Sequence, residues 1–248
     1  MDSLDFSILI PAFIAGVLVL STHVPLGMKV LQRGIIFADL AVAQIAGLGV
    51  IVAGLTGLAD NTLMVQIIAA TSALLGAALL AYAERRLPEV QEAVIGLLFV
   101  LAATGGILLM SRDVHAGEHL KDLLVGQILW VSNSQLIVTA LVSVVLLVLL
   151  RVFAQRLNSF GFYALFALAI TASVQLVGIY LVFASLIVPA LATHKLKLRR
   201  MAVANAIGIA GYLMGLLLSV WFDLPAGAAI VWMMVLVGAP VLLRRSAV

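Results

Sequence analysis

The longest hydrophilic stretch of the chain, Ser111 to Asp122, holds imidazole and carboxylate side chains close together. These groups are ligands suited to Zn²⁺, Mn²⁺ or Fe²⁺. If the stretch is helical, its two histidines lie one turn apart on the same face. The pattern predicts contact with a metal ion, and a solvated loop is the alternative reading. The candidate ligands are Asp113, His115, Glu118 and His119.

A second polar group, Asp39, stands at the start of a long apolar run. A carboxylate at the edge of a lipid bilayer costs a few kcal/mol unless it is hydrated or paired. Arg33 is the candidate partner, and an acid in the first turn of a helix is also favoured by the helix dipole. The alternative is a carboxylate on the path of an ion, with Gln44 deeper on the same helix. The sequence leaves both readings open.

Two further apolar runs contain polar or helix-breaking residues. His23 is followed by Pro25 and Gly27, which indicate a kinked region, and we expect His23 to be a hydrogen-bonded packing residue. Pro189 removes a backbone hydrogen bond from a later run. It could shape a gate on a translocation path or a simple kink.

Several kinds of chemistry are excluded. The chain has no cysteine, which rules out disulfides, thiolate metal sites and cysteine nucleophiles. The polar stretches show no convincing hydrolytic triad. No Gly-x-x-x-x-Gly-Lys-[Ser/Thr] phosphate loop occurs, so any ATP must bind another chain. We therefore expect no enzymatic activity in this subunit.

The composition of the chain shows which kind of secondary structure must position these groups, because it is far more apolar than that of a soluble protein. Hydrophobic residues make up 65% of the 248 residues and charged residues only 10%. A soluble domain is nearer 45–50% apolar and about 25% charged. The apolar runs are continuous and lack the alternation of barrel strands. The sequence predicts an all-α integral membrane protein with one transmembrane domain over residues 1–248.

The uncharged windows give the number of crossings, because a helix needs about 20 apolar residues to span the hydrocarbon. The window 157–194 has 38 residues, which is about 57 Å of helix and enough for two crossings that turn near Gln175 to Gly178. The total is then about nine. The windows are 6–28, 40–59, 61–83, 93–111, 123–150, 157–194, 201–222 and 224–243.

The distribution of charge supports this count. With nine crossings, all but two of the 14 basic residues fall on one face, the exceptions being Arg112 and Lys121. The positive-inside rule then predicts an external N-terminus and a cytoplasmic C-terminus. The first run lacks a basic leader and is expected to be a retained span. Candidate contacts of this inner face with an ATPase, or with anionic headgroups, are Arg85, Arg86, Arg156, Lys195 and Lys197.

Four segments resemble motifs of the metal-type ABC importer permeases, the membrane subunits of importers for zinc, manganese and iron(II). They follow the order of that family and cover almost the whole chain. The segment with Pro189 and the turn Asp223–Gly227 are the most specific. The segments are Leu26–Asp39, Leu124–Trp130, Val177–Thr193 and Trp221–Ala228.

The resemblance implies a helical permease that works as a homodimer in a bacterial inner membrane, on two cytoplasmic ATPase subunits that bind ATP. It implies a periplasmic or surface-tethered metal-binding protein that delivers the ion, and alternating access as the mechanism. Zinc or manganese is the expected cargo. Asp39 matches the aspartate of the family, which implies a place near the ion route.

Two departures from the family pattern bear on this reading. Ala43 stands where the family has a histidine, and Arg151–Phe160 lacks the segment that docks into the ATPase. The second departure favours an alternative, an ATPase-independent secondary metal ion carrier. A membrane scaffold or an intramembrane protease is a further alternative, but a protease needs a second membrane acid or a Ser/His dyad at depth.

Overall fold

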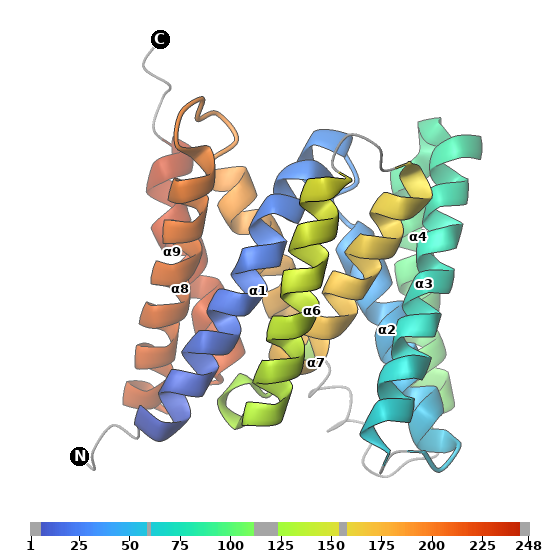
Figure 1. Ribbon diagram of the computed structural model, residues 1–248, viewed down its shortest axis with the longest axis horizontal. Helices are drawn as coiled ribbons and strands as arrows, with labels where there is room; N and C mark the ends of the chain where they lie inside the picture. Colours follow the sequence, from blue (N-terminus) through green and yellow to red (C-terminus); the bar gives the residue numbers. More distant parts are fainter. Residues whose placement is uncertain (1–5, 59–60, 112–123, 154–157, 244–248) are drawn as a thin grey trace.

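The computed structural model describes residues 6–58, 61–111, 124–153 and 158–243, and over these residues it is a bundle of helices without strands (Figure 1). Eight helices are long and apolar enough to cross a membrane. They are α1 (Phe6–Arg33), α2 (Ala38–Leu55), α3 (Thr62–Arg86), α4 (Gln91–Leu109), α6 (Asn133–Val152), α7 (Ser159–Ala192), α8 (Arg200–Phe222) and α9 (Ala226–Leu243). Two 3-10 helices, η1 (Pro88–Val90) and η2 (Ile128–Trp130), connect them.

Polar side chains fix where three of the helices begin. Asn61 accepts a hydrogen bond from the backbone N–H of Met64 and caps α3, and Asn158 caps α7 in the same way. Ser132 and Gln135 form a reciprocal capping box at the start of α6. Because the first amides of a helix have no partner inside it, such caps select the starting residue. The residues before Ser132 are therefore left outside the crossing.

Helix α7 is the central element, and it contains two crossings. Its 34 residues are interrupted at Gly178, whose φ of 78° is non-helical. The start of α7 lies beside the end of α1, because the Arg33 guanidinium sits over the Phe162 ring. Gln175 is hydrogen-bonded to Gln66 at the opposite end of the bundle, whereas Ala192 packs near Gly238 of α9 back at the first end. The chain therefore reverses at Gly178, within the predicted turn.

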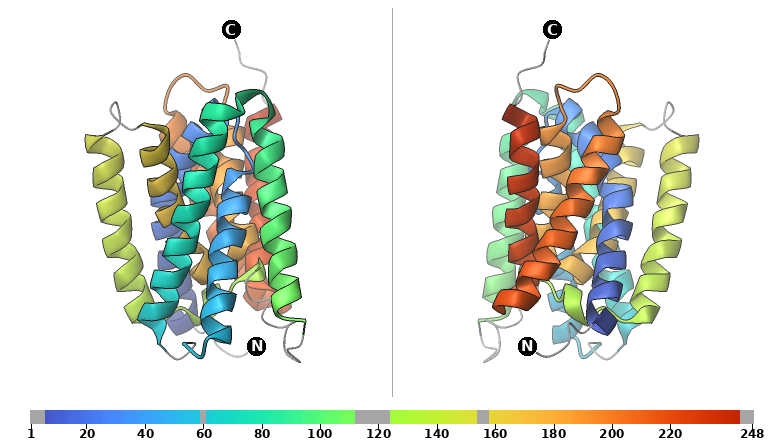
Figure 2. Two further views of the ribbon diagram at one scale, coloured as in Figure 1. Left: turned by 90° about the vertical axis from the view of Figure 1, so that its right-hand side faces the viewer. Right: turned by 90° about the vertical axis from the view of Figure 1, so that its left-hand side faces the viewer.

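With this reversal the described helices traverse the bundle nine times, as the charge distribution predicts. Helix α1 begins at one end and α9 finishes at the other (Figures 1 and 2). We call these the N-terminal side, where α1 begins, and the C-terminal side, where α1 and α9 end. The fold class expected from the sequence is confirmed.

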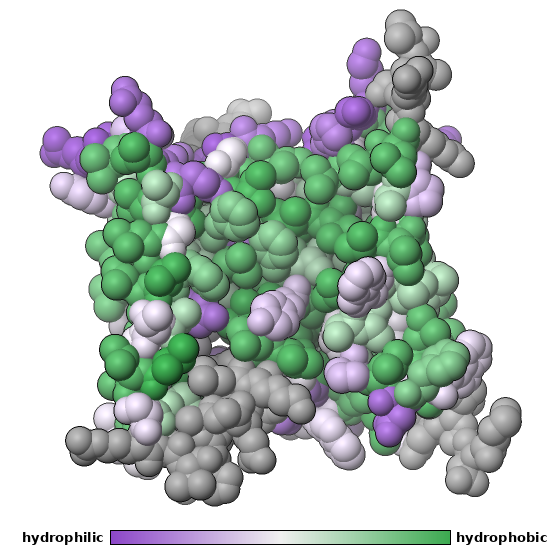
Figure 3. Space-filling model, turned by 180° about the vertical axis from the view of Figure 1, so that it is seen from behind, coloured by the Kyte–Doolittle hydropathy of each residue, from purple (hydrophilic) through white to green (hydrophobic). Residues whose placement is uncertain are grey.

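The surface has the pattern of a protein surrounded by lipid. Apolar residues cover the middle of the face in Figure 3, and hydrophilic residues gather along its upper edge, which is the C-terminal side. Large apolar side chains such as Leu108, Leu141 and Trp232 are more than 60% exposed on the helices. The basic residues of the described chain lie toward the C-terminal side. This separation of apolar belt and charged end is what a bilayer requires.

The segment Leu124–Val131, which includes η2, lies at the N-terminal side of the bundle before α6 begins. Gly126, with a φ of 75°, lies against the backbone of Gly178, and Gly227 of α9 lies against the carbonyl of Val125. A Cβ atom at any of these glycines would overlap the neighbouring backbone. Glycine is required here because the backbones touch and because positive φ is strained for other residues.

We expect Gly178→Ala to destabilise the fold strongly. The φ of 78° and ψ of 164° at Gly178 lie in a region that essentially only glycine adopts, at a cost of about 1–3 kcal/mol for other residues, and the new methyl group would also displace the backbone of Gly126. The measurement is the thermal unfolding midpoint of the purified protein in detergent. Gly96→Ala in α4 is the matched control, because its methyl group would meet no atom within 4 Å. Equal midpoints for the two variants would show that the reversal does not depend on this contact.

Candidate functional site

Asp39 is buried in the first turn of α2, with 1% of its surface exposed. Among the described residues neither carboxylate oxygen has a partner of good hydrogen-bond geometry, although the backbone N–H groups of Asp39 and Leu40 lie close to it. The positive end of the helix dipole favours an acid at this position. A carboxylate shut away from water without a partner is nevertheless costly, and in membrane proteins such groups mark ion or proton routes.

Arg33 is not the partner of Asp39, so the expected pairing is wrong. The Nη1 atom of Arg33 lies 3.4 Å from Oε1 of Glu84, at the end of α3, and its guanidinium carbon lies 4.1 Å from the centre of the Phe162 ring. Gly34, with a φ of 69°, turns the chain immediately after Arg33. The arginine therefore reaches across to α3 and α7, while the chain continues into α2.

The sequence reading missed the acids that surround this end of α2. Glu92 of α4 accepts a hydrogen bond of 3.1 Å from the backbone N–H of Phe37, and it acts electrostatically on Asp39. Glu92 and Glu84 each keep one buried oxygen without a partner. Beside them, Gln91 donates a hydrogen bond of 2.7 Å to the hydroxyl of Tyr163. The mixed-charge turn Glu84–Glu92 was the available signal, but the sequence could not say which helix it faces.

This arrangement can attract a cation. Three helices bring three acids to the C-terminal side, and Arg33 forms an ion pair with one of them, Glu84. The described residues nevertheless contain no group of three His, Asp or Glu side chains placed to hold one metal ion. The described part of the site is therefore a cluster of acids around the start of α2 and not a closed coordination cage.

The other two predicted path residues lie on α2 and α7. Gln44 is half-buried on α2, and at about 100° per residue it lies on a different face from Asp39. Pro189 is buried in the second half of α7, and its carbonyl accepts a hydrogen bond of 2.7 Å from Thr193. The place of Gln44 and Pro189 on a translocation path stays a prediction.

The predicted partner-facing residues divide into two groups. Arg85 and Arg86 are exposed in the last turn of α3, and Lys195 and Lys197 are exposed in the connection between α7 and α8. Both pairs lie on the C-terminal side. Five further predicted residues lie outside the described residues: Asp113, His115, Glu118, His119 and Arg156.

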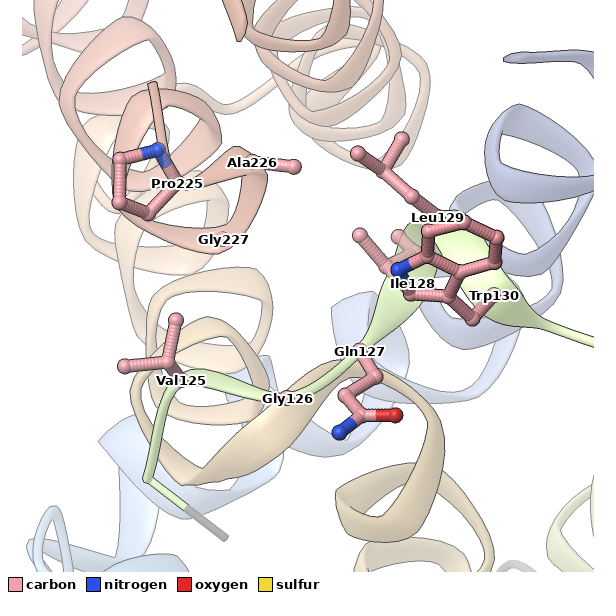
Figure 4. Close-up of a pocket in the computed structure, with 9 residues that line it drawn as sticks. All are labelled: Val125, Gly126, Gln127, Ile128, Leu129, Trp130, Pro225, Ala226 and Gly227. Atoms are coloured by element: carbon pink, nitrogen blue, oxygen red, sulfur yellow. The ribbon is translucent and has the colours of Figure 1, made fainter. Parts of the chain in front are cut away.

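A pocket of about 550 Å³ opens on the N-terminal side. Val125–Trp130 and Pro225–Gly227 face each other across it (Figure 4). These two segments belong to two of the motifs singled out in the sequence, and Gly178, from a third motif, touches Gly126. Three motifs that are far apart in the sequence therefore meet at one end of the bundle.

Comparison with known proteins gives two curated relatives. The chain is 30% identical over 163 residues to a probable iron transport system membrane protein of Haemophilus influenzae, covering 57% of this chain and 60% of the relative. The chain thus matches less than two thirds of that relative's length. It is 26% identical over 250 residues to the manganese transport system membrane protein MntC of Halalkalibacterium halodurans, covering 92% of this chain and 84% of the relative.

A solved structure has the same fold. It is PsaBC from Streptococcus pneumoniae in complex with Fab, with a TM-score of 0.78 at 22% identity, covering 98% of this chain and 93% of that one. The model of the ABC 3 transport family matches residues 5–162 and 155–244, which together include nearly the whole chain. The chain is therefore a multi-pass membrane protein that belongs to the ABC 3 transport family.

Proposed function

We propose that the chain is the permease subunit of an ABC importer for a divalent transition-metal ion, with manganese or zinc as cargo. The observation that carries the proposal is Asp39, a fully buried carboxylate inside a membrane crossing, without a partner of good hydrogen-bond geometry among the described residues. Two further observations support a metal cation as the cargo. The chain belongs to the ABC 3 transport family, and its two relatives are named as iron and manganese transport proteins.

The mechanism is alternating access, without covalent chemistry in this subunit. A cation enters from the N-terminal side, is drawn toward Asp39, and leaves past Glu84 and Glu92 on the C-terminal side. The acids stabilise a dication that has lost part of its hydration shell, because opposite charge is worth more at low dielectric. ATP is hydrolysed on partner subunits, whose closure opens the inner route.

The positive-inside rule supports the orientation, with the basic C-terminal side in the cytoplasm of a bacterial inner membrane. A periplasmic or surface-tethered metal-binding protein then delivers the ion to the N-terminal side, where Asp113, His115, Glu118 and His119 are candidate ligands. We propose a homodimer, in keeping with the family resemblance. The ATPase subunits contact the C-terminal side.

Two exposed basic elements are available for the ATPase, since the docking segment of the family is missing from Arg151–Phe160. The turn after α3 presents Arg85 and Arg86 together with Leu87 and Val90, whose side chains are about half exposed. The connection after α7 presents Lys195 and Lys197. Apolar groups beside cations are typical of a protein interface.

Asp39→Ala is expected to abolish uptake of radioactive Mn²⁺ or Zn²⁺ by cells that express the complete transporter, because it removes the buried negative charge on the route. Membrane abundance should stay normal. Glu89→Gln is the control, since this acid is exposed outside the crossings and its loss should leave uptake unchanged. Normal uptake by Asp39→Ala would contradict the proposed route.

The same carboxylate should lower the stability of the fold. Asp39→Asn keeps the size of the side chain but replaces a buried carboxylate by a neutral amide, and burying a charge costs more than burying a neutral polar group. We therefore expect a higher unfolding midpoint in detergent together with loss of uptake. A lower midpoint would mean that the carboxylate is held by a favourable interaction and serves the structure.

Reversing charge at Arg85 and Arg86 to Glu should remove the ATPase from the purified complex. Both cations are exposed, so the fold of the permease should survive, and size-exclusion chromatography checks this. Arg151→Glu, at an exposed arginine ending α6, is the matched control. Full uptake by a permease that binds no ATPase would instead establish the secondary metal ion carrier.

A further inference from the structure

The imidazole of His23 is completely buried in α1, and none of the roles proposed so far uses it. Its exposed fraction is 0%. Nδ1 lies 2.9 Å from the carbonyl oxygen of Val19 and 3.0 Å from the hydroxyl of Thr22, whereas Nε2 is buried without a partner. It is the one imidazole inside the described membrane-crossing helices.

The surroundings of Nδ1 assign the tautomer. A carbonyl oxygen only accepts, so Nδ1 carries the hydrogen and donates it to Val19. The hydroxyl of Thr22 also donates to the Val19 carbonyl, at 3.1 Å. The other nitrogen, Nε2, therefore bears a free lone pair. A ring nitrogen that donates to a backbone carbonyl while the other offers a lone pair is the usual arrangement of a metal-ligating histidine.

His23 lies on the face of α1 that meets α7 and α8. At about 100° per residue, Gly16, Leu20, His23 and Gly27 form one stripe along the helix. Gly16 packs against the ring of Tyr212 in α8, and Gly27 packs against the carbonyl of Leu186 in α7. His23 falls between these two close contacts.

The same junction contains a second pair of buried polar groups. Ser185 of α7 and Tyr212 of α8 are hydrogen-bonded through their hydroxyls at 2.9 Å, and neither is exposed. Ser185 adjoins Leu186, which touches α1, and the Tyr212 ring also touches α1. An imidazole on α1, a hydroxyl on α7 and a phenol on α8 are therefore all buried on the faces where these three helices pack.

Two prolines interrupt the helices at this junction. Pro25 cannot donate to the carbonyl of Ser21 in α1, and Pro189 cannot donate to the carbonyl of Ser185 in α7. Carbonyls released in this way coordinate ions in broken membrane helices. Each of these two carbonyls lacks its usual helical donor, and they belong to α1, which carries His23, and to α7, which packs on α1.

We propose that the junction of α1, α7 and α8 binds the transported transition-metal ion and that Nε2 of His23 is its nitrogen ligand. The inference rests on the proposed function and adds a basis for ion selectivity. Imidazole suits Zn²⁺ and other transition metals, whereas Mg²⁺ and Ca²⁺ prefer oxygen ligands alone. His23 would therefore favour transition metals over the more abundant hard cations.

The direct test is spectroscopic. His115, His119 and His194 are replaced by Gln and the permease is purified without a histidine tag, so that His23 is the only imidazole. Electron spin echo measurements on bound Mn²⁺ should then show modulation from a coordinated ¹⁴N nucleus. Adding His23→Asn should remove it, because Asn keeps a donor for the Val19 carbonyl but lacks the second nitrogen. Absence of the ¹⁴N signal in the His23-only protein would overturn the proposal.

The second test measures uptake of ⁵⁴Mn²⁺ by the complete transporter in liposomes. His23→Asn should raise KM at least about tenfold, the effect of losing a partner at a metal site, and Mg²⁺ should then compete more strongly. Thr171→Val is the control, since this buried hydroxyl bonds only to its own helix, at Ala167. If the original chain transports no metal, the proposed function fails. If it does and His23→Asn matches it in KM and selectivity, only this inference fails.

Discussion

Gly126 and Gly178 touch through their backbones, and the arrangement of the N-terminal side depends on this contact. Gly178 ends one crossing and starts the next, while Gly126 belongs to the segment Leu124–Val131 that precedes α6. In lipid, a backbone that leaves the helix must be covered by protein, because its polar groups have no water to bind. The glycine contact provides this cover, and it also brings Val125–Trp130 to Pro225–Gly227, where the pocket forms.

The C-terminal side is organised by charge instead of by backbone contact. Arg33 joins α1 to α3 through Glu84 and to α7 through Phe162, and Glu92 holds the start of α2. These bonds place three helix ends around Asp39 without giving it a partner. A bundle of this kind has acids ready for a cation at one end and a pocket at the other. Both features suit a protein that passes an ion between two sides.

Alternating access needs helices that can bend, and the structure has such points. Pro25 lies inside α1, and Gly178 and Pro189 lie inside α7, the most deeply buried of the described helices. Helix bending in membranes is normally found at such residues, because the broken hydrogen bonds leave the helix free to change direction. Rotation about these points would alter the packing at the C-terminal and N-terminal sides together.

The sequence alone determined the helical membrane class, the nine passes, the turn near Gly178 and the single basic end, and it pointed to the family. These features follow from local properties: the length of an apolar run and the cost of a charge in lipid. The family motifs in Val125–Trp130 and Pro225–Gly227 were visible too, but not their meeting.

Only the tertiary structure decided which residues meet. Arg33 was expected to pair with Asp39 and instead pairs with Glu84, since helix neighbours and the turn at Gly34 set its direction. The place of Glu92 beside α2 and of His23 between α7 and α8 likewise depends on rotation of each helix about its axis. An apolar run surrounded by lipid has little amphipathic pattern to fix that rotation, so it emerges only when the helices pack.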